Sequence, residues 1–126
     1  MTTSETHEDL YGLKRWGRGF FEVLENGDVA LKNPLSPDAP PVSLPGIIRD
    51  LEKRGIHTPM ILRVSSYLED AIRQINESFR DAIKRTGYQG TYRGVFPIKV
   101  NQQAQVVDRI VEFGRKYDFG LEAGAK

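Results

Sequence analysis

Lys99 is the residue whose type and position most clearly suggest chemistry. It lies near the carboxyl end of residues 90–100 (GTYRGVFPIKV), an aromatic and β-branched run that predicts a strand. Alternation along that strand places Lys99 on one face with Val95 and Pro97, whereas Phe96 points to the face that packs against helices. The sequence thus predicts one ammonium group near the end of a largely apolar strand.

A lysine amine at that position can act as a nucleophile. Ligand sites of parallel α/β folds lie at the carboxyl ends of the strands. Partial dehydration there favours the neutral amine, which attacks carbonyl groups, and pyridoxal phosphate is the common aldehyde that such lysines bind. The alternative is a strand-end lysine that reaches into solvent, the more frequent situation in proteins.

Three helices are predicted from the spacing of apolar residues. They cover residues 46–54, which stop before Gly55, residues 65–85, which a serine can cap, and residues 101–116, which Asn101 can cap. The buried stripe of the second helix is predicted to consist of Leu68, Ile72, Ile75, Phe79 and Ile83. That of the third helix is predicted to consist of Val106, Val107, Ile110 and Phe113.

Strands are predicted between these helices, at residues 59–64, 90–100 and 117–121. Strands that alternate with helices imply a parallel sheet covered by helices. Two α/β layouts fit this order, an open doubly wound sheet and the opening segment of a (β/α)8 TIM-like barrel. Because such a barrel takes about 250 residues, the chain could hold only its first third and would be incomplete.

The first 45 residues have a different character. Residues 1–10 are predicted to be a flexible tail, and residues 11–32 a β-hairpin with strands at 19–24 and 28–32 around Asn26-Gly27. A lone hairpin is marginal in water, so it is expected to dock on other structure. Residues 33–45 contain five prolines and are predicted to be an extended linker that separates two domains.

Composition excludes several classes of function. Hydrophobic residues make up 39% and charged residues 28%, values typical of a globular protein. The net charge of +1 gives no field to attract nucleic acid or a membrane, and the absence of cysteine with only two histidines argues against a metal site. No signal peptide and no apolar run of about 20 residues is found, so a cytoplasmic location is expected.

Four stretches closely resemble the biosynthetic arginine decarboxylases. They are YGLKRWGRGFFEV (11–23), RGIHTPMILRV (54–64), GVFPIKVNQQ (94–103) and FGLEAGAK (119–126). The resemblance implies a pyridoxal phosphate enzyme that combines a (β/α)8 barrel with a β-domain. It also implies conversion of L-arginine to agmatine and CO2 at the start of polyamine and spermidine biosynthesis, a homo-oligomer when intact, and a magnesium ion as a further cofactor.

The same resemblance implies roles for individual residues. The lysine of the family's P-[IV]-K-V-N motif, which attaches the cofactor, falls on Lys99. Glu122 follows the next strand, where relatives carry an acid close to the cofactor, so a contact with the cofactor or with Lys99 is implied; a solvated carboxylate is the alternative. Ala125 stands where the family usually has serine, and loss of that hydroxyl could weaken a local cap or a cofactor contact.

The resemblance also assigns the segments to domains. Residues 11–32 would belong to the β-domain and pair with sequence outside this chain, and residues 46–126 would form the first α/β units of the barrel. Because family members are several times longer, the chain is expected to be an N-terminal fragment or a truncated gene product, inactive alone. The alternatives are a non-catalytic interaction module and a decarboxylase of ornithine or diaminopimelate, whose typical Y-A-x-K motif differs from FPIKVNQQ.

Overall fold

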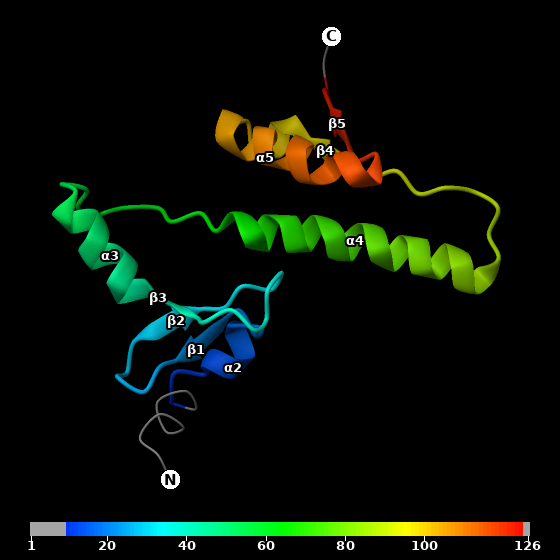
Figure 1. Ribbon diagram of the computed structural model, residues 1–126. Coiled ribbons are helices and arrows are strands. Elements are labelled where there is room, and N and C mark those ends of the chain that lie inside the picture. Colours follow the sequence, from blue (N-terminus) through cyan, green and yellow to red (C-terminus); the bar gives the residue numbers. More distant parts are fainter. Residues whose placement is uncertain (1–9, 125–126) are drawn as a thin grey trace. The chain divides into compact units, whose positions relative to one another are not determined.

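The computed structural model describes residues 10–124, which divide into two compact units, one ending at Arg63 and the other beginning at Val64 (Figure 1). The first unit holds a three-stranded sheet and the second a two-stranded sheet. Residues 1–9 of the predicted tail, and Ala125, lie outside the described residues. No helix in the described part is both long and apolar enough to cross a membrane.

The predicted hairpin is confirmed in the first unit. Its elements in chain order are helix α2 (Leu13–Trp16) and strands β1 (Phe21–Val23) and β2 (Val29–Leu31). The strands are antiparallel, with Phe21 opposite Leu31 and Val23 opposite Val29. Of the Asn26-Gly27 pair only the glycine takes a positive φ, of 85°. The turn is therefore a longer loop that ends in one left-handed glycine.

The proline-rich segment 33–45, predicted to be a linker, lies within the first compact unit. Its end forms strand β3 (Val42–Ser43), which pairs antiparallel with β2 and completes the sheet in the order β1-β2-β3. Helix α3 (Leu44–Lys53) follows at once and contacts both β2 and β3. Since the second edge of β2 is already paired with β3, the boundary between the compact units falls later in the chain, after Arg63.

Ser43 joins this sheet to helix α3. Its hydroxyl oxygen accepts a hydrogen bond from the Gly46 amide at 2.9 Å, the geometry of a helix N-cap, and its hydroxyl donates to the Asp28 carboxylate at 2.5 Å. The hydrogen bond from Ser43, assisted by Arg49, holds the pKa of Asp28 below its ordinary value. Gly55, at φ 78°, follows the end of α3 as predicted.

The second unit contains the alternating helices and strands. Its elements are α4 (Ser65–Thr86), β4 (Val95–Pro97), the 3-10 helix η1 (Ile98–Val100), α5 (Ala104–Gly114), the 3-10 helix η2 (Arg115–Tyr117) and β5 (Gly120–Glu122). Helices α4 and α5 contact each other, and α4 extends beyond α5 (Figure 1). Strands β4 and β5 are parallel and joined through α5, which confirms the predicted α/β connection.

The strand predicted at residues 59–64 is absent. The segment is not assigned to any strand or helix, and Ile61 is 79% exposed. A strand is held by hydrogen bonds to a neighbouring strand, and Pro59 has no N–H to give. An apolar run of this length is therefore not enough to form a strand when no neighbour pairs with it.

The core of the second unit lies between the two long helices and the sheet. Its buried members are Ile72 on α4, Ile110 on α5 and Tyr117 on η2. Leu68, Phe96, Val106, Phe113 and Phe119 pack against them. The core position predicted for Ile110 is confirmed, and Gly87, at φ 65°, ends α4 as expected.

The predicted stripe of α4 is partly wrong. Ile75 and Phe79 are about half exposed, at 47% and 50%, whereas Asp70 and Asn76 are buried. Apolar spacing locates a stripe, but the packing around the helix decides which residues are covered, and of this stripe Ile72 is buried in the core whereas Ile75 and Phe79 are not. A serine cap is also absent, because the N-cap residue is Val64.

Asn76 is a weak point of this core, and its replacement by leucine is expected to stabilise the chain. Its side-chain nitrogen donates to the Ile72 carbonyl at 2.8 Å, but its buried side-chain oxygen has no partner. Removing an unpaired buried acceptor while keeping the branched shape of the side chain should raise the free energy of unfolding by about 1 kcal/mol in urea denaturation. As a control, Asn76→Asp should lower it by about 3 kcal/mol at neutral pH, because it buries an unpaired charge. A leucine variant less stable than the parent would contradict this account.

Candidate active site

Lys99 and Glu122 follow two adjacent parallel strands. The register pairs Val95 with Gly120 and Pro97 with Glu122. Glu122 is therefore the last residue of β5, and Lys99 comes directly after β4 in the turn η1. Because the carboxyl ends of parallel strands lie at one edge of the sheet, both predicted site residues come to that edge, where parallel α/β proteins bind their ligands.

The turn η1, and not the strand, positions Lys99. The strand predicted over residues 90–100 covers only Val95–Pro97, and Ile98–Val100 form a single turn of 3-10 helix. The ladder ends where Pro97 pairs with Glu122, the last residue of β5, and residues 98–100 have no strand partner. Strand alternation therefore does not determine where the Lys99 side chain lies, and that part of the sequence argument is wrong.

The Lys99 amine is open to solvent in this structure. Lys99, Val100 and Glu122 are all exposed. The expected partial dehydration of the amine is thus not seen, because two strands of three residues leave the carboxyl edge of the sheet uncovered. Within residues 10–124 neither Lys99 nor Glu122 takes part in an ion pair, so the amine is accessible to an incoming carbonyl compound.

Asn101 shapes the segment that leads from Lys99 to helix α5. Its side-chain oxygen accepts a hydrogen bond from the Gln103 amide at 3.0 Å, which forms a tight turn. The N-cap residue of α5 is Gln103, so the prediction that Asn101 caps this helix is wrong. Asn101 instead fixes the turn between η1 and the helix, and this turn limits how far Lys99 can move from the end of β4.

Gly94 and Gly114 allow β4 and β5 to lie close together. The Gly94 carbonyl accepts a hydrogen bond from the Gly120 amide at 2.9 Å. A Cβ atom at Gly94 would collide with the Phe119 ring, and one at Gly114 would come within 2.8 Å of the Phe119 Cβ. Sequence reasoning did not single out these residues, since a glycine before an apolar strand gives no sign of which ring will cover it. Their small size lets Phe119 pack inward, which places β5 and its last residue, Glu122, beside β4.

No metal site is found beside these residues. Across the described range, 10–124, no three histidine, aspartate or glutamate side chains come together in a way that could hold an ion.

Comparison with known proteins identifies relatives over nearly the whole chain. No protein-family model matches. The biosynthetic arginine decarboxylase of Gloeobacter violaceus is 41% identical over 124 residues, which cover 98% of this chain and 19% of that protein. That of Thermosynechococcus vestitus is 42% identical over 124 residues, with the same two shares. The chain is homologous to the N-terminal part of the biosynthetic arginine decarboxylases.

A solved structure agrees with this homology. The crystal structure of the biosynthetic arginine decarboxylase SpeA from Campylobacter jejuni is 33% identical and superimposes with a TM-score of 0.80, over 92% of this chain and 19% of that one. The expected resemblance to the arginine decarboxylases is thereby confirmed. The chain spans about a fifth of the length of the arginine decarboxylases that it matches, 18–19% in each case.

Proposed function

We propose that this chain contributes the cofactor-attaching lysine of an arginine decarboxylase that converts L-arginine to agmatine and CO2, a reaction of polyamine biosynthesis. The observation that carries the proposal is the placement of Lys99 directly after β4, beside a parallel strand that ends at Glu122. Homology to arginine decarboxylases supports it, since a match over 124 of 126 residues spans both positions.

Lys99 and Glu122 have the chemistry that pyridoxal phosphate requires of a protein. An accessible amine can hold the cofactor through its aldehyde carbon, and a carboxylate on the neighbouring strand can accept a hydrogen bond or balance a positive charge. When bound, the cofactor supplies an electron sink for the electron pair that the departing carboxylate leaves behind. Lys99 would anchor the cofactor through its side-chain amine, and the same amine could hold a proton. Glu122 orients the cofactor or the Lys99 amine.

The fold of the second unit suits the opening of a (β/α)8 barrel. Two parallel strands joined through α5, with α4 packed on α5, form the repeating element from which such a barrel is built. Closing the barrel would supply the strands that cover Lys99 and dehydrate its amine. In the same proposal the hairpin of strands β1 and β2 belongs to the β-domain of a homo-oligomeric enzyme.

A chimaeric enzyme tests this function. The chain replaces the matched N-terminal part of the Campylobacter jejuni arginine decarboxylase, and the purified protein is supplied with pyridoxal phosphate. We expect it to release CO2 and agmatine from L-arginine, whereas the same enzyme without its N-terminal part and without this chain should be inactive. Circular dichroism and gel filtration establish that the chimaera is folded before activity is compared.

Substrate and cofactor binding separate the alternatives. A folded chimaera that binds the cofactor and decarboxylates ornithine or diaminopimelate, but not arginine, would show that the substrate assignment is wrong. A folded chimaera that does not bind the cofactor would contradict the whole proposal and favour a non-catalytic interaction module.

A further inference from the structure

A pocket of the second compact unit lies at the opposite end of strands β4 and β5 from Lys99. It has a volume of about 390 Å³ and is lined by the last turns of α4, the segment leading into β4 and the residue that follows η2. Its polar and aromatic lining includes Arg80, Lys84, Thr91, Tyr92, Arg93 and Asp118. Thr91, Tyr92 and Arg93 precede β4 and Asp118 precedes β5, so the pocket lies at the amino ends of both strands. It is therefore separate from the edge that carries Lys99 and Glu122.

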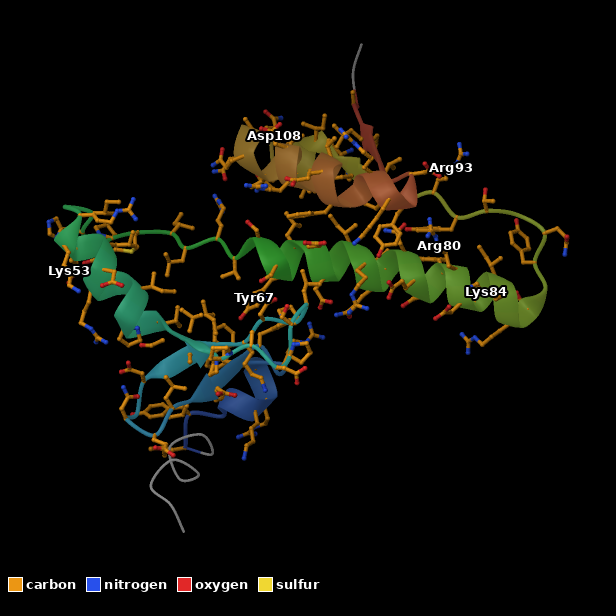
Figure 2. All side chains as sticks on the ribbon, viewed as in Figure 1. Lys53, Tyr67, Arg80, Lys84, Arg93 and Asp108 are labelled. Atoms are coloured by element: carbon orange, nitrogen blue, oxygen red, sulfur yellow. The ribbon has the colours of Figure 1, made fainter. Side chains whose placement is uncertain are left out.

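The residues that line the pocket carry more positive than negative charge. Arg80 and Lys84 lie one turn apart on α4, and Arg93 lies in the segment before β4 (Figure 2). Asp118 is the single acid among the lining residues. Within the described residues none of the three cations forms an ion pair, in contrast to Arg73, which binds Asp70 at 2.6 Å and Glu77 at 2.8 Å on the same helix. An anion entering the pocket would meet three cations and one carboxylate.

Aromatic contacts hold the walls of the pocket in place. The Arg80 guanidinium carbon lies 4.9 Å from the centre of the Tyr117 ring, and the buried Tyr117 donates from its hydroxyl to Glu77 at 3.3 Å. The Tyr92 ring stacks on Phe79 with centroids 4.0 Å apart and planes 6° from parallel. Because the Arg80 head group and the Tyr92 ring are already positioned, a ligand loses less binding energy in ordering them.

We propose that this pocket binds an organic phosphate. Arginine guanidinium groups match phosphate oxygens with paired N–H donors, lysine adds a point charge, and the Thr91 hydroxyl is a further donor. The volume falls within the range of small-molecule sites and exceeds what a bare phosphate ion needs. Tyr92 and Ile83, which also line the pocket, offer apolar surface for an organic group attached to the phosphate. The inference does not depend on the proposed decarboxylase function.

Titration of the isotopically labelled 126-residue chain, followed by amide NMR, tests the proposal. The two probes are phenyl phosphate and inorganic phosphate, both at constant ionic strength because screening weakens exposed charges. We expect saturable shifts at the Thr91 and Arg93 amides, with tighter binding of phenyl phosphate. Arg93→Gln should weaken phenyl phosphate binding by about three- to sixfold, the worth of one exposed ion pair. Asp118→Asn should strengthen it by a similar factor.

Opposite effects of the two variants distinguish ligand binding from a structural role. Asn is well tolerated at the left-handed φ of 55° that Asp118 adopts, so Asp118→Asn should keep the fold. Arg109→Gln is the matched control, because Arg109 pairs with Glu112 on α5 and does not line the pocket. Equal binding of both probes would overturn the organic part of the proposal. Shifts that do not saturate, or that both variants leave unchanged, would overturn it entirely.

Discussion

Replacing Lys99 by alanine in the chimaeric enzyme is expected to abolish attachment of pyridoxal phosphate and to lower arginine decarboxylation by about 10³-fold or more. The size follows from the loss of the amine that anchors the cofactor, since removing a covalently acting residue typically costs several kcal/mol of transition-state stabilisation. Borohydride reduction fixes the cofactor to the nitrogen that holds it, and peptide mapping by mass spectrometry then identifies the residue. The pyridoxyl group should lie on Lys99 in the parent chimaera.

A second lysine serves as the control for this experiment. Lys53, at the end of α3, pairs with Asp50 at 2.9 Å and lies in the first compact unit (Figure 2). Lys53→Ala should leave both the adduct and the activity unchanged. A pyridoxyl group mapped to another lysine, or a folded Lys99→Ala variant that keeps its activity, would remove the basis of the proposed function.

The elements that could be predicted from the sequence are those with local signals. Asn26-Gly27 predicted the hairpin, and Gly55 and Gly87 predicted the ends of two helices. These signals are local, because the backbone at Gly27, Gly55 and Gly87 takes a left-handed conformation that glycine adopts readily. The parallel pairing of β4 and β5 also followed, since a helix between two strands leaves little other choice.

The features that were predicted wrongly depend on neighbours. Residues 59–64 have the apolar composition of a strand, yet a strand forms only where another backbone pairs with it. On α4 the polar Asn76 is buried while the apolar Phe79 is half exposed, so the tertiary packing and not the residue type decides which positions are covered. No spacing rule contains that information, because the apolar stripe is wider than the face that the partner covers.

In the candidate site, too, some features follow from the sequence and others depend on neighbouring elements. The arrival of Lys99 and Glu122 at one edge follows from strand direction and connection, which the sequence predicts. The turn that carries Lys99 depends on where the ladder ends, and that point is fixed by the length of β5 on the other side of α5. Predicting the position of a side chain to within one turn therefore requires the length of the partner strand. Predicting at which edge of the sheet the side chain lies does not.

Gly94→Ala is expected to destabilise the second unit by about 1 to 3 kcal/mol, the cost of forcing extra volume into a packed core. The added methyl group would occupy the space of the Phe119 ring, which packs against the buried core, so the ring or the strand must shift. Urea denaturation measures the loss. Amide hydrogen exchange at Gly120 localises it, because that amide donates to the Gly94 carbonyl and should lose protection when the strands separate.

Gly124→Ala is the matched control, since it makes the same chemical change where no atom lies within 4 Å of the added carbon. It should alter stability by no more than about 0.5 kcal/mol, as surface substitutions usually do. If Gly94→Ala behaved like Gly124→Ala, close packing of Phe119 on Gly94 would not be what sets β5 beside β4. The edge that joins Lys99 to Glu122 would then need another explanation. If only Gly94→Ala lowered the stability, and the Gly120 amide then lost its protection from hydrogen exchange, the geometry of the site would depend on the absence of a side chain at residue 94.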